Sequence, residues 1–341
     1  MADPFYIQWH ITNLCNLRCQ HCYQDDFSKQ KDLDWSGLKR ISDNIHATLE
    51  QWEKNGCIHL TGGEPLLKSE LFLLLEDLNQ RRMIQELGII TNGLFLNMDV
   101  IEKLSTFSKL KKVKVSLDGA NPQINDSIRE KGNFEKVIQN ISLIKKENRF
   151  ETIIMFTAMA RNFRSLPSFI RLCQNLGVDG LILERFIPWG RGKEIRDEVL
   201  DKTEWRELVE TLFELFSINM EEDHFYPHQA FQIFFKEDEM ELLGAPCVIG
   251  RDGLCIMPEG EVYPCRRFPI SIGNLLEVPL KQIWEESEIL EKLRRKENLK
   301  GKCRVCEIKD CRGCRSLTLA LTGDYLGEDP HCPFDALSPS S

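Results

Sequence analysis

The chain has 341 residues, of which 42% are hydrophobic and 28% are charged, and its formal net charge is −9 at pH 7. This is the composition of an ordinary globular protein, and the length predicts one barrel of about 200–250 residues plus a smaller appendage. A net negative charge excludes a general phosphate-backbone binder, so we expect no nucleic-acid partner. No apolar run reaches the roughly 18 residues of a membrane span, and no secretory signal is visible, which predicts a cytoplasmic protein that binds no membrane.

Short apolar or β-branched runs alternate with longer amphipathic segments through the first 216 residues. The helical segments, such as LKRISDNIHATLEQW and FEKVIQNISLIKKE, carry apolar residues at helical spacing. Six strand–helix units in a row predict a parallel sheet with right-handed crossovers, closed or nearly closed. The predicted strands are residues 5–12, 56–60, 87–91, 112–117, 152–159 and 181–187.

Polar or glycine-rich segments come directly after these strands. CNLRCQHC (15–22) follows the first strand, and TGGEP (61–65) follows the second. TNG follows the third strand, SLDG ends the fourth, and RFIPWGRG follows the sixth. Because ligands bind at the carboxyl ends of the strands in such sheets, we expect these segments to form one site on one rim.

The 13 cysteines are the unusual feature of the composition. In a reducing compartment, metal or cluster ligation explains them better than disulfides do. Cys15, Cys19 and Cys22 offer three thiolates with no local fourth. A 4Fe–4S cluster held by three cysteines keeps one iron open for a small molecule. The alternative is a zinc site completed by His21 or by a distant ligand.

The C-x3-C-x2-C spacing after the first strand, Tyr23 directly behind it, and GGEP after the next strand resemble the radical S-adenosylmethionine (SAM) superfamily. The resemblance implies that Cys15, Cys19 and Cys22 hold the catalytic cluster. It also implies that S-adenosylmethionine binds the open iron and is cleaved to a 5′-deoxyadenosyl radical, which abstracts hydrogen from a substrate. The implied cofactor-binding residues are Tyr23, Gly62, Gly63, Glu64, Pro65, Ser116, Asp118 and Arg129.

The resemblance also gives these residues individual roles. The GGEP backbone would meet the methionine amino group, and glycine without a Cβ lets the main chain approach a ligand closely. Ser116 and Asp118 would contact the ribose, and Arg129 would pair with the methionine carboxylate, which suits the planar fork of a guanidinium. Asn125 stands where relatives often carry histidine, and we give it no role.

The C-terminal cysteines resemble the SPASM extension found on one branch of that superfamily. CIMPEGEVYPC (255–265) predicts a hairpin that turns at PEG. By resemblance, the nearer of two auxiliary 4Fe–4S clusters would be held by Cys247, Cys255, Cys265 and Cys314. The outer cluster would be held by Cys303, Cys306, Cys311 and Cys332. Spacing by itself would instead group Cys303, Cys306, Cys311 and Cys314, and eight ligands could also fill two zinc sites.

The remaining two thiols, Cys57 and Cys173, are interpreted as ordinary buried residues.

Together, these features predict an α/β fold, a partial (β/α)6 TIM-like barrel with a small C-terminal iron–sulfur (SPASM) domain. The predicted boundaries are 1–216 for the barrel, 217–245 for a bridging segment and 246–341 for the SPASM domain. The predicted cofactors are S-adenosylmethionine and three 4Fe–4S clusters, one catalytic and two auxiliary.

The function we predict is a radical SAM enzyme, an oxidoreductase-type maturase, that oxidises, cross-links or otherwise modifies a peptide or protein, with the auxiliary clusters as electron acceptors. The alternative is a small-molecule radical enzyme, such as a tetrapyrrole side-chain decarboxylase or a cofactor-maturing enzyme. A non-catalytic iron–sulfur electron carrier is a third class, and the open cluster together with GGEP and Arg129 argues against it.

Two further features bear on the substrate. Arg266 and Arg267 follow Cys265, where sulfatase-maturing relatives carry an aspartate base, and this weakens a serine- or cysteine-oxidising reading. The barrel begins near residue 5, so peptide recognition would need a separate leader-recognition protein or direct binding in the barrel. Glu184 and Arg185 would point either into the barrel or outward. The resemblance implies a flavodoxin or ferredoxin as reductant.

Overall fold

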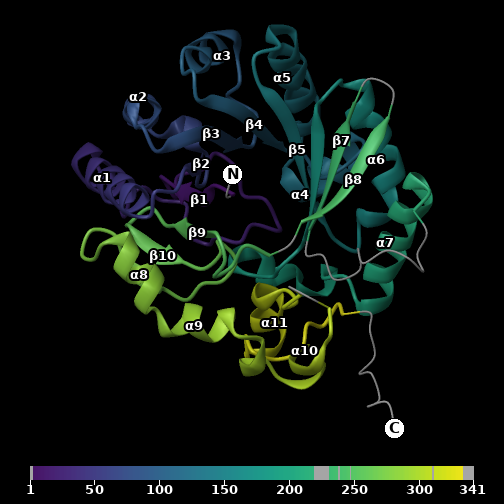
Figure 1. Cartoon of the computed structure of the whole chain (residues 1–341). Helices are drawn as coiled ribbons and strands as arrows, with labels where there is room; N and C mark the ends of the chain where they lie inside the picture. Colours follow the sequence, from purple (N-terminus) through teal and green to yellow (C-terminus); the bar gives the residue numbers. More distant parts are fainter. Residues whose placement is uncertain (1–2, 219–229, 237–238, 246, 309–310, 333–341) are drawn as a thin grey trace.

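The computed structural model describes residues 3–218, 230–236, 239–245, 247–308 and 311–332 (Figure 1). Six strands lie side by side in chain order, and each is parallel to the next. This arrangement confirms the predicted parallel sheet and the partial barrel. The strands are β1 (Phe5–His10), β2 (Gly56–Thr61), β3 (Ile84–Thr91), β4 (Leu110–Ser116), β5 (Glu151–Ala158) and β6 (Gly180–Arg185).

Most of the helices that connect these strands surround the outside of the sheet (Figure 1). They are α1 (Trp35–Gln51), α2 (Leu71–Gln80), α3 (Met98–Ser105), α4 (Pro122–Arg129), α5 (Asn133–Glu147), α6 (Leu166–Asn175) and α7 (Lys202–Phe216). Short 3₁₀ turns complete the connections at η1 (Pro65–Leu67), η2 (Phe163–Ser165) and η3 (Gly190–Glu198).

Local sequence explains where these helices begin and which face they bury. The Asp34 carboxylate accepts a hydrogen bond from the Gly37 amide and caps α1, and Asp201 with Glu204 forms a capping box at the start of α7. In α6 the buried positions are Leu166, Phe169, Ile170 and Cys173, a spacing of three and four residues. That stripe packs on the sheet, as the helical periodicity predicts.

Strand β1 shows how the barrel interior differs from its outer face. Ile7 and Trp9 are completely buried in the hydrophobic core. Because side chains alternate along a strand, Tyr6, Gln8 and His10 share the opposite face. These three side chains are polar, and Gln8 lines the interior pocket described below. The barrel therefore encloses a polar interior.

The sheet continues beyond the six parallel strands on both sides. Strands β7 (Ala230–Phe235) and β8 (Met240–Ala245) form an antiparallel hairpin against β6, within the 217–245 segment. On the other side β9 (Gly253–Ile256) pairs in parallel with β1. Strands β10 (Glu261–Tyr263) and β11 (Gly273–Asn274) follow. The predicted hairpin at PEG is present between β9 and β10, with Gly260 at a positive φ of 89°.

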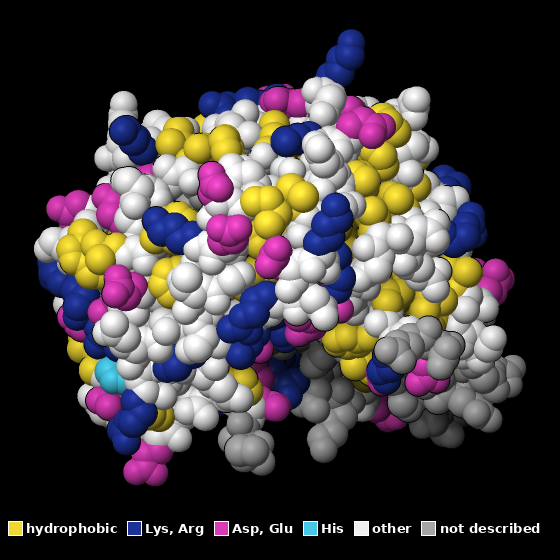
Figure 2. Space-filling view, turned by 90° about the horizontal axis from the view of Figure 1, so that it is seen from above, with side chains coloured by type: hydrophobic (Ala, Val, Ile, Leu, Met, Phe, Trp, Pro, Cys, Tyr) yellow, Lys and Arg dark blue, Asp and Glu magenta, His cyan; other side chains and the backbone are white. Residues whose placement is uncertain are grey.

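The C-terminal part contains α8 (Leu280–Glu286), α9 (Glu288–Arg294), η4 (Lys296–Asn298), α10 (Gly301–Val305) and α11 (Arg315–Thr322). Figure 1 places these helices below the barrel, in green and yellow. Within the described ranges, no helix is long and apolar enough to cross a membrane. On the face seen in Figure 2, basic and acidic side chains are interspersed, so this face offers no continuous basic surface of the kind that nucleic acid requires.

Candidate active site

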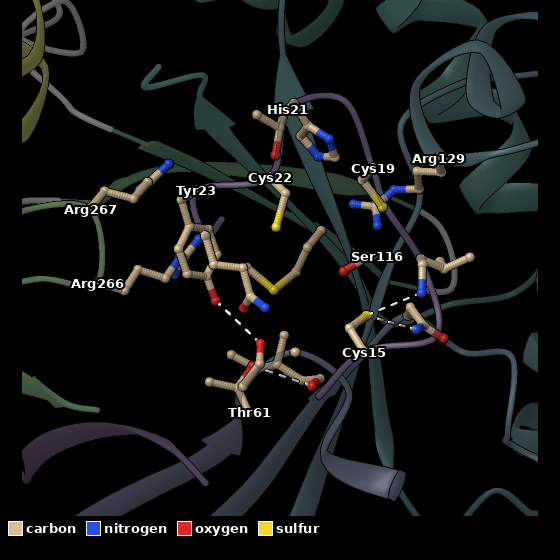
Figure 3. A pocket seen from close by; sticks show the side chains of 18 of the residues that line it. Cys15, Cys19, His21, Cys22, Tyr23, Thr61, Ser116, Arg129, Arg266 and Arg267 are labelled. Atoms are coloured by element: carbon tan, nitrogen blue, oxygen red, sulfur yellow. Dashed lines mark hydrogen bonds between the residues drawn. The ribbon is translucent and has the colours of Figure 1, made fainter. Parts of the chain in front are cut away.

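A pocket lies at the carboxyl ends of the barrel strands, on the predicted rim. The loop after β1 places Cys15, Cys19 and Cys22 in its lining, and Figure 3 shows these side chains around one space. The predicted cofactor-binding residues that also line this pocket are Tyr23, Gly62, Gly63, Ser116 and Arg129. Segments up to 114 residues apart in the chain therefore meet at one site.

The two glycines let the segment after β2 run directly against the cysteine loop. The Gly63 amide donates to the Thr12 carbonyl at 2.8 Å, and the Glu64 amide donates to the Leu14 carbonyl at 2.8 Å. A Cβ at Gly62 would lie 2.3 Å from the Thr12 carbonyl oxygen, and one at Gly63 would lie 2.4 Å from that of Leu14. Both neighbours are backbone atoms, so only glycine permits this close approach.

Glu64 lies behind the pocket wall and does not line the pocket. Its buried carboxylate accepts hydrogen bonds from the Thr91 hydroxyl at 2.7 Å, the Asn92 amide at 2.8 Å and the Leu66 amide at 3.1 Å. Burial raises the pKa of Glu64 to about 7, although these hydrogen bonds favour the charged form. Glu64 therefore joins the segments that follow β2 and β3, and Pro65 begins the 3₁₀ turn η1 beside it.

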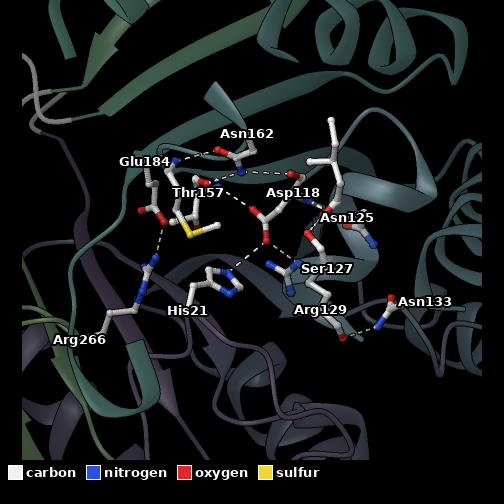
Figure 4. Close-up of polar contacts among 12 residues, drawn as sticks. His21, Asp118, Asn125, Ser127, Arg129, Asn133, Thr157, Asn162, Glu184 and Arg266 are labelled. Carbon is white, nitrogen blue, oxygen red and sulfur yellow. Dashed lines mark hydrogen bonds and ion pairs between the residues drawn. The ribbon is translucent and has the colours of Figure 1, made fainter. Parts of the chain in front are cut away.

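Asp118 also lies outside the pocket lining, with no exposed surface. Figure 4 shows its carboxylate between two side chains, Arg129 with its Nε at 2.6 Å and His21 with its Nε2 at 3.1 Å. The Thr157 amide donates to the other oxygen at 2.7 Å, and the Asp118 amide donates to Asn125 at 3.0 Å. Burial opposes the charge, but Arg129 and His21 outweigh it and lower the pKa of Asp118 to about 2. This geometry orients Arg129 toward the pocket.

The wall opposite Cys19 and Arg129 carries two arginines that the sequence did not lead us to place there (Figure 3). Arg266 donates to Gln8 at 2.9 Å and pairs with Glu184, while Arg267 donates to the second Glu184 oxygen at 3.2 Å. All four of these residues line the pocket. Two guanidinium groups share one carboxylate, so this wall keeps a net positive charge.

Glu184 therefore points into the barrel, whereas its neighbour Arg185 does not line the pocket. Burial opposes the charge of Glu184, but the two arginines outweigh it and lower the pKa to about 2. Arg185 pairs with the buried Asp329 at 3.0 Å and lies over the Trp205 ring at 4.2 Å. Of these two neighbours on β6, Glu184 thus lies in the pocket and Arg185 contacts the C-terminal part.

The three pocket thiols need a bound metal to become thiolates. Burial raises the pKa of the Cys19 thiol to about 12 and that of Cys22 to about 11, and Arg129 acts in the opposite direction on both. A bound metal deprotonates a coordinating thiol outright. In the part of the chain that the structure describes, the one group with three ligand atoms within 4.8 Å of one another lies elsewhere, at Cys57, His59 and Glu86. The Cys15, Cys19 and Cys22 thiols are spread more widely than a single ion requires.

The C-terminal cysteines fall into two neighbourhoods. After burial itself, the charges of Cys314 and Cys265 contribute to raising the pKa of Cys247 to about 12. Cys265 acts on Cys255 in the same way. These charges couple Cys247 to both Cys314 and Cys265, and Cys255 to Cys265.

The second neighbourhood contains Cys303, Cys306 and Cys311. Burial raises the pKa of Cys311, and the charges of Cys306 and Cys303 add to that shift. The Asp329 amide donates to the Cys303 sulfur at 3.5 Å, and the Cys332 amide donates to the Asp329 carbonyl at 3.0 Å. The C-terminal segment that carries Cys332 is thereby tied to Cys303.

Comparisons with known proteins agree with this geometry. The model of the Radical SAM superfamily matches residues 9–172, and that of the SPASM iron-sulfur cluster-binding domain matches residues 247–315. An AdoMet-dependent heme synthase from Methanosarcina barkeri is 30% identical, over 97% of each chain. Mycofactocin maturase MftC from Mycolicibacterium smegmatis is 27% identical, over 96% of this chain and 82% of that one.

The fold has solved counterparts as well. The crystal structure of Streptococcus suis SuiB bound to precursor peptide SuiA has a TM-score of 0.72 and 17% identity, covering 98% of this chain and 77% of that one. The chain is therefore a radical SAM enzyme. It belongs to the radical SAM superfamily, and more narrowly to those members that carry a SPASM domain, with S-adenosylmethionine and iron–sulfur clusters as cofactors.

Proposed function

We propose that Cys15, Cys19 and Cys22 hold a catalytic 4Fe–4S cluster whose open iron binds S-adenosylmethionine. Together these groups supply a 5′-deoxyadenosyl radical. The proposal rests on the convergence of the three thiols with Gly62 and Gly63 on one pocket. In it, the backbone of these glycines meets the methionine moiety at close range, because no Cβ intervenes.

The remaining predicted cofactor residues divide into contacts and positioning residues. We assign Tyr23, Ser116 and Arg129 to direct contacts because they line the pocket. Arg129 is fixed by Asp118, so its planar donor fork is oriented before the carboxylate of the cofactor arrives. Glu64 and Asp118 are thus positioning residues, and Pro65 shapes the turn that follows.

Two auxiliary 4Fe–4S clusters complete the proposed set of three. The proximity of Cys247 to Cys314 and Cys265 supports the nearer cluster, and that of Cys311 to Cys306 and Cys303 supports the outer one. Soft thiolates are the usual ligands of such clusters. In this proposal residues 1–216 form the radical SAM barrel and 246–341 the auxiliary-cluster domain, and strands β7 and β8 of the segment between them lie at the sheet edge.

The substrate that the pocket fits best carries carboxylate groups. Arg266 and Arg267 face the cysteines across the pocket, and among the described residues they share one carboxylate, Glu184. Guanidinium groups bind carboxylates through paired hydrogen bonds. We therefore propose that the enzyme abstracts hydrogen from an anionic substrate anchored at this wall, and that the auxiliary clusters accept the electron which the substrate then gives up.

Two sources of such carboxylates each have a named relative. A tetrapyrrole with acidic side chains is supported by the heme synthase, which matches this chain over 97% of both lengths. A peptide or protein with acidic residues is supported by the mycofactocin maturase. In the peptide case a separate leader-recognition protein is a possible partner. A flavodoxin- or ferredoxin-type protein is the proposed reductant for both.

The test is anaerobic formation of 5′-deoxyadenosine by dithionite-reduced protein. Cys19→Ala should abolish the product and lower iron from about 12 to about 8 per chain if each cluster holds four irons. Cys173→Ala is the matched control, because that thiol is buried in α6 away from the pocket, and it should change neither quantity. A Cys19→Ala variant that makes as much product as the parent would refute the catalytic assignment.

The substrate is then separated by adding a peptide pool or a small-metabolite pool from cell extract, each with and without protease treatment. Stimulation that protease abolishes identifies a peptide or protein substrate. Stimulation that resists protease and is confined to the small metabolites identifies the tetrapyrrole class. In either case Arg266→Gln should weaken the stimulation, because it removes a charge from the anionic-substrate wall.

A further inference from the structure

A second cluster of potential metal ligands lies in the barrel, away from the cysteine loop. Cys57 and His59 are two residues apart on β2, so their side chains lie on the same face of the strand. Glu86 lies opposite Cys57 on the neighbouring strand β3. The Cys57 sulfur is 3.6 Å from the His59 Nε2 and 3.4 Å from the Glu86 Oε1, and those two atoms are 3.6 Å apart. Cys57 is the second residue of β2 and Glu86 is the third residue of β3, so the cluster lies toward the amino-terminal ends of these strands.

These three separations match the edges of a tetrahedral zinc site. With Zn–S near 2.3 Å and Zn–N and Zn–O near 2.0–2.1 Å, tetrahedral angles place sulfur about 3.5–3.6 Å from nitrogen or oxygen, and nitrogen about 3.3–3.4 Å from oxygen. The observed triangle of 3.4, 3.6 and 3.6 Å lies within about 0.3 Å of each expected edge. A single ion can therefore contact all three atoms with little rearrangement.

The surroundings of His59 present its Nε2 to the site. Tyr6 is hydrogen-bonded to the Nδ1 of His59 at 3.1 Å, and the two rings meet edge to face at 5.0 Å. A hydrogen bond at one ring nitrogen fixes which nitrogen remains for the metal. Gly88 leaves room on the same side, since a Cβ there would lie 2.8 Å from the Nε2.

Access fits an ion that enters from the end of the barrel. Cys57 and His59 are 9% and 2% exposed, whereas the Glu86 side chain is 25% exposed and supplies an entry path. Lys112 lies 3.4 Å from the same Glu86 oxygen and also 3.4 Å from Glu151. The lysine therefore keeps an acidic partner when a metal ion takes Glu86.

We propose that Cys57, His59 and Glu86 bind one divalent transition-metal ion, with zinc as the preferred ion and water at the fourth position. Thiolate, imidazole and carboxylate are all zinc ligands, and the mixed set favours zinc over an iron–sulfur cluster. The ion would tie β2 to β3, where the ladder shifts register between Gly56 and Cys57.

Zinc content tests this proposal independently of radical chemistry. The full-length, cluster-containing protein is purified anaerobically, equilibrated with ZnCl₂, desalted and analysed for zinc and iron. We expect one zinc per chain, and a zinc X-ray absorption spectrum with a single sulfur neighbour at about 2.3 Å and lighter neighbours at about 2.0–2.1 Å. Zinc that occupies the cluster cysteines instead would show several sulfur neighbours and would overturn the assignment.

Variants locate the ion without relying on activity. Cys57→Ala should lose the zinc equivalent while keeping its iron, and Cys173→Ala should keep both. Glu86→Gln, at a partly exposed side chain, guards against misfolding and should weaken zinc binding at least tenfold. Tyr6→Phe should weaken it about 10- to 100-fold, as loss of a partner of a ligating histidine does. Equal zinc in Cys57→Ala and the parent, or none in either, refutes the proposal.

Discussion

Replacing Asp118 by asparagine removes the carboxylate on which Arg129 and His21 converge. The substitution keeps the shape of the side chain but leaves the Arg129 guanidinium, 7% exposed, without its anionic partner. Breaking a buried ion pair from one side costs about 3–5 kcal/mol, because a buried charge is left uncompensated. At about 2 °C per kcal/mol for a chain of this length, we expect the melting temperature to fall by about 6–10 °C.

The same pair predicts a pH dependence. The pKa of Asp118 is about 2 in the folded protein, below its ordinary value of 3.8, because Arg129 and His21 outweigh the effect of burial. The unfolded chain therefore binds this proton more readily, and the pair stabilises the fold above pH 4. That contribution is lost as the pH falls from about 4 toward 2. The difference between parent and Asp118→Asn should thus shrink as the pH falls below about 4.

The assay is thermal unfolding of anaerobic, cluster-loaded protein, followed by circular dichroism at one scan rate. Asp43→Asn is the matched control, since it removes a half-exposed carboxylate that pairs with Lys39 and Arg81, and Arg81 keeps its second partner Asp77. Exposed pairs contribute at most about 1 kcal/mol, so this control should melt within about 2 °C of the parent. If Asp118→Asn melts as close to the parent as this control does, the buried pair does not hold the pocket wall.

Three further results are expected. Gly63→Ala should impair cluster loading and S-adenosylmethionine binding, measured by iron content and equilibrium dialysis, because its Cβ would lie 2.4 Å from a backbone carbonyl oxygen. Cys247→Ala and Cys314→Ala should each remove about four irons, and the double variant should remove no more than about four. Cys303→Ala combined with Cys314→Ala should instead remove about eight irons. The reverse pattern would support grouping by sequence spacing. Arg267→Gln should raise the KM for an anionic substrate about tenfold and leave uncoupled 5′-deoxyadenosine formation unchanged, and an unchanged KM would contradict a substrate role.

The sequence predicted the parts of the site that depend on local spacing. The cysteine loop, the two glycines of TGGEP and the serine at the end of β4 each follow a strand, so the parallel topology brings them to one rim. The strand predictions agree with the structure to within three residues at each end. The hydrophobic period located the strands, and the repeated strand–helix alternation predicted their parallel order.

Contacts that depend on distant packing were not accessible in this way. Arg266 meets Glu184 across 82 residues, and β9 joins the sheet beside β1 across more than 240 residues. Both follow from how the C-terminal part packs on the barrel, which no local pattern encodes. Asp118 illustrates a subtler limit, because spacing placed it at the rim but could not show that its carboxylate turns away from the pocket and toward Arg129.

Cys57 shows the same limit for a possible metal ligand. In the sequence it is a single cysteine at the start of a buried strand, and its neighbour His59 is separated from Glu86 by 27 positions. Only the pairing of β2 with β3 brings the three ligand atoms together. A C-x-H pattern with no local third ligand has no recognisable metal-binding spacing, so ordinary burial was the natural reading of this thiol.

The C-terminal part completes the active-site pocket as well as carrying the auxiliary cysteines. Strand β9 satisfies the edge of β1 that would otherwise be open, directly before the loop that holds Cys15, Cys19 and Cys22. The hairpin that begins with β9 then delivers Arg266, which follows Cys265 in the chain, to the pocket wall. A proposed auxiliary-cluster ligand and a proposed substrate anchor are thus adjacent in the chain. In the proposed function, an electron leaving a substrate held at Arg266 would therefore have only a short distance to travel to the nearer auxiliary cluster.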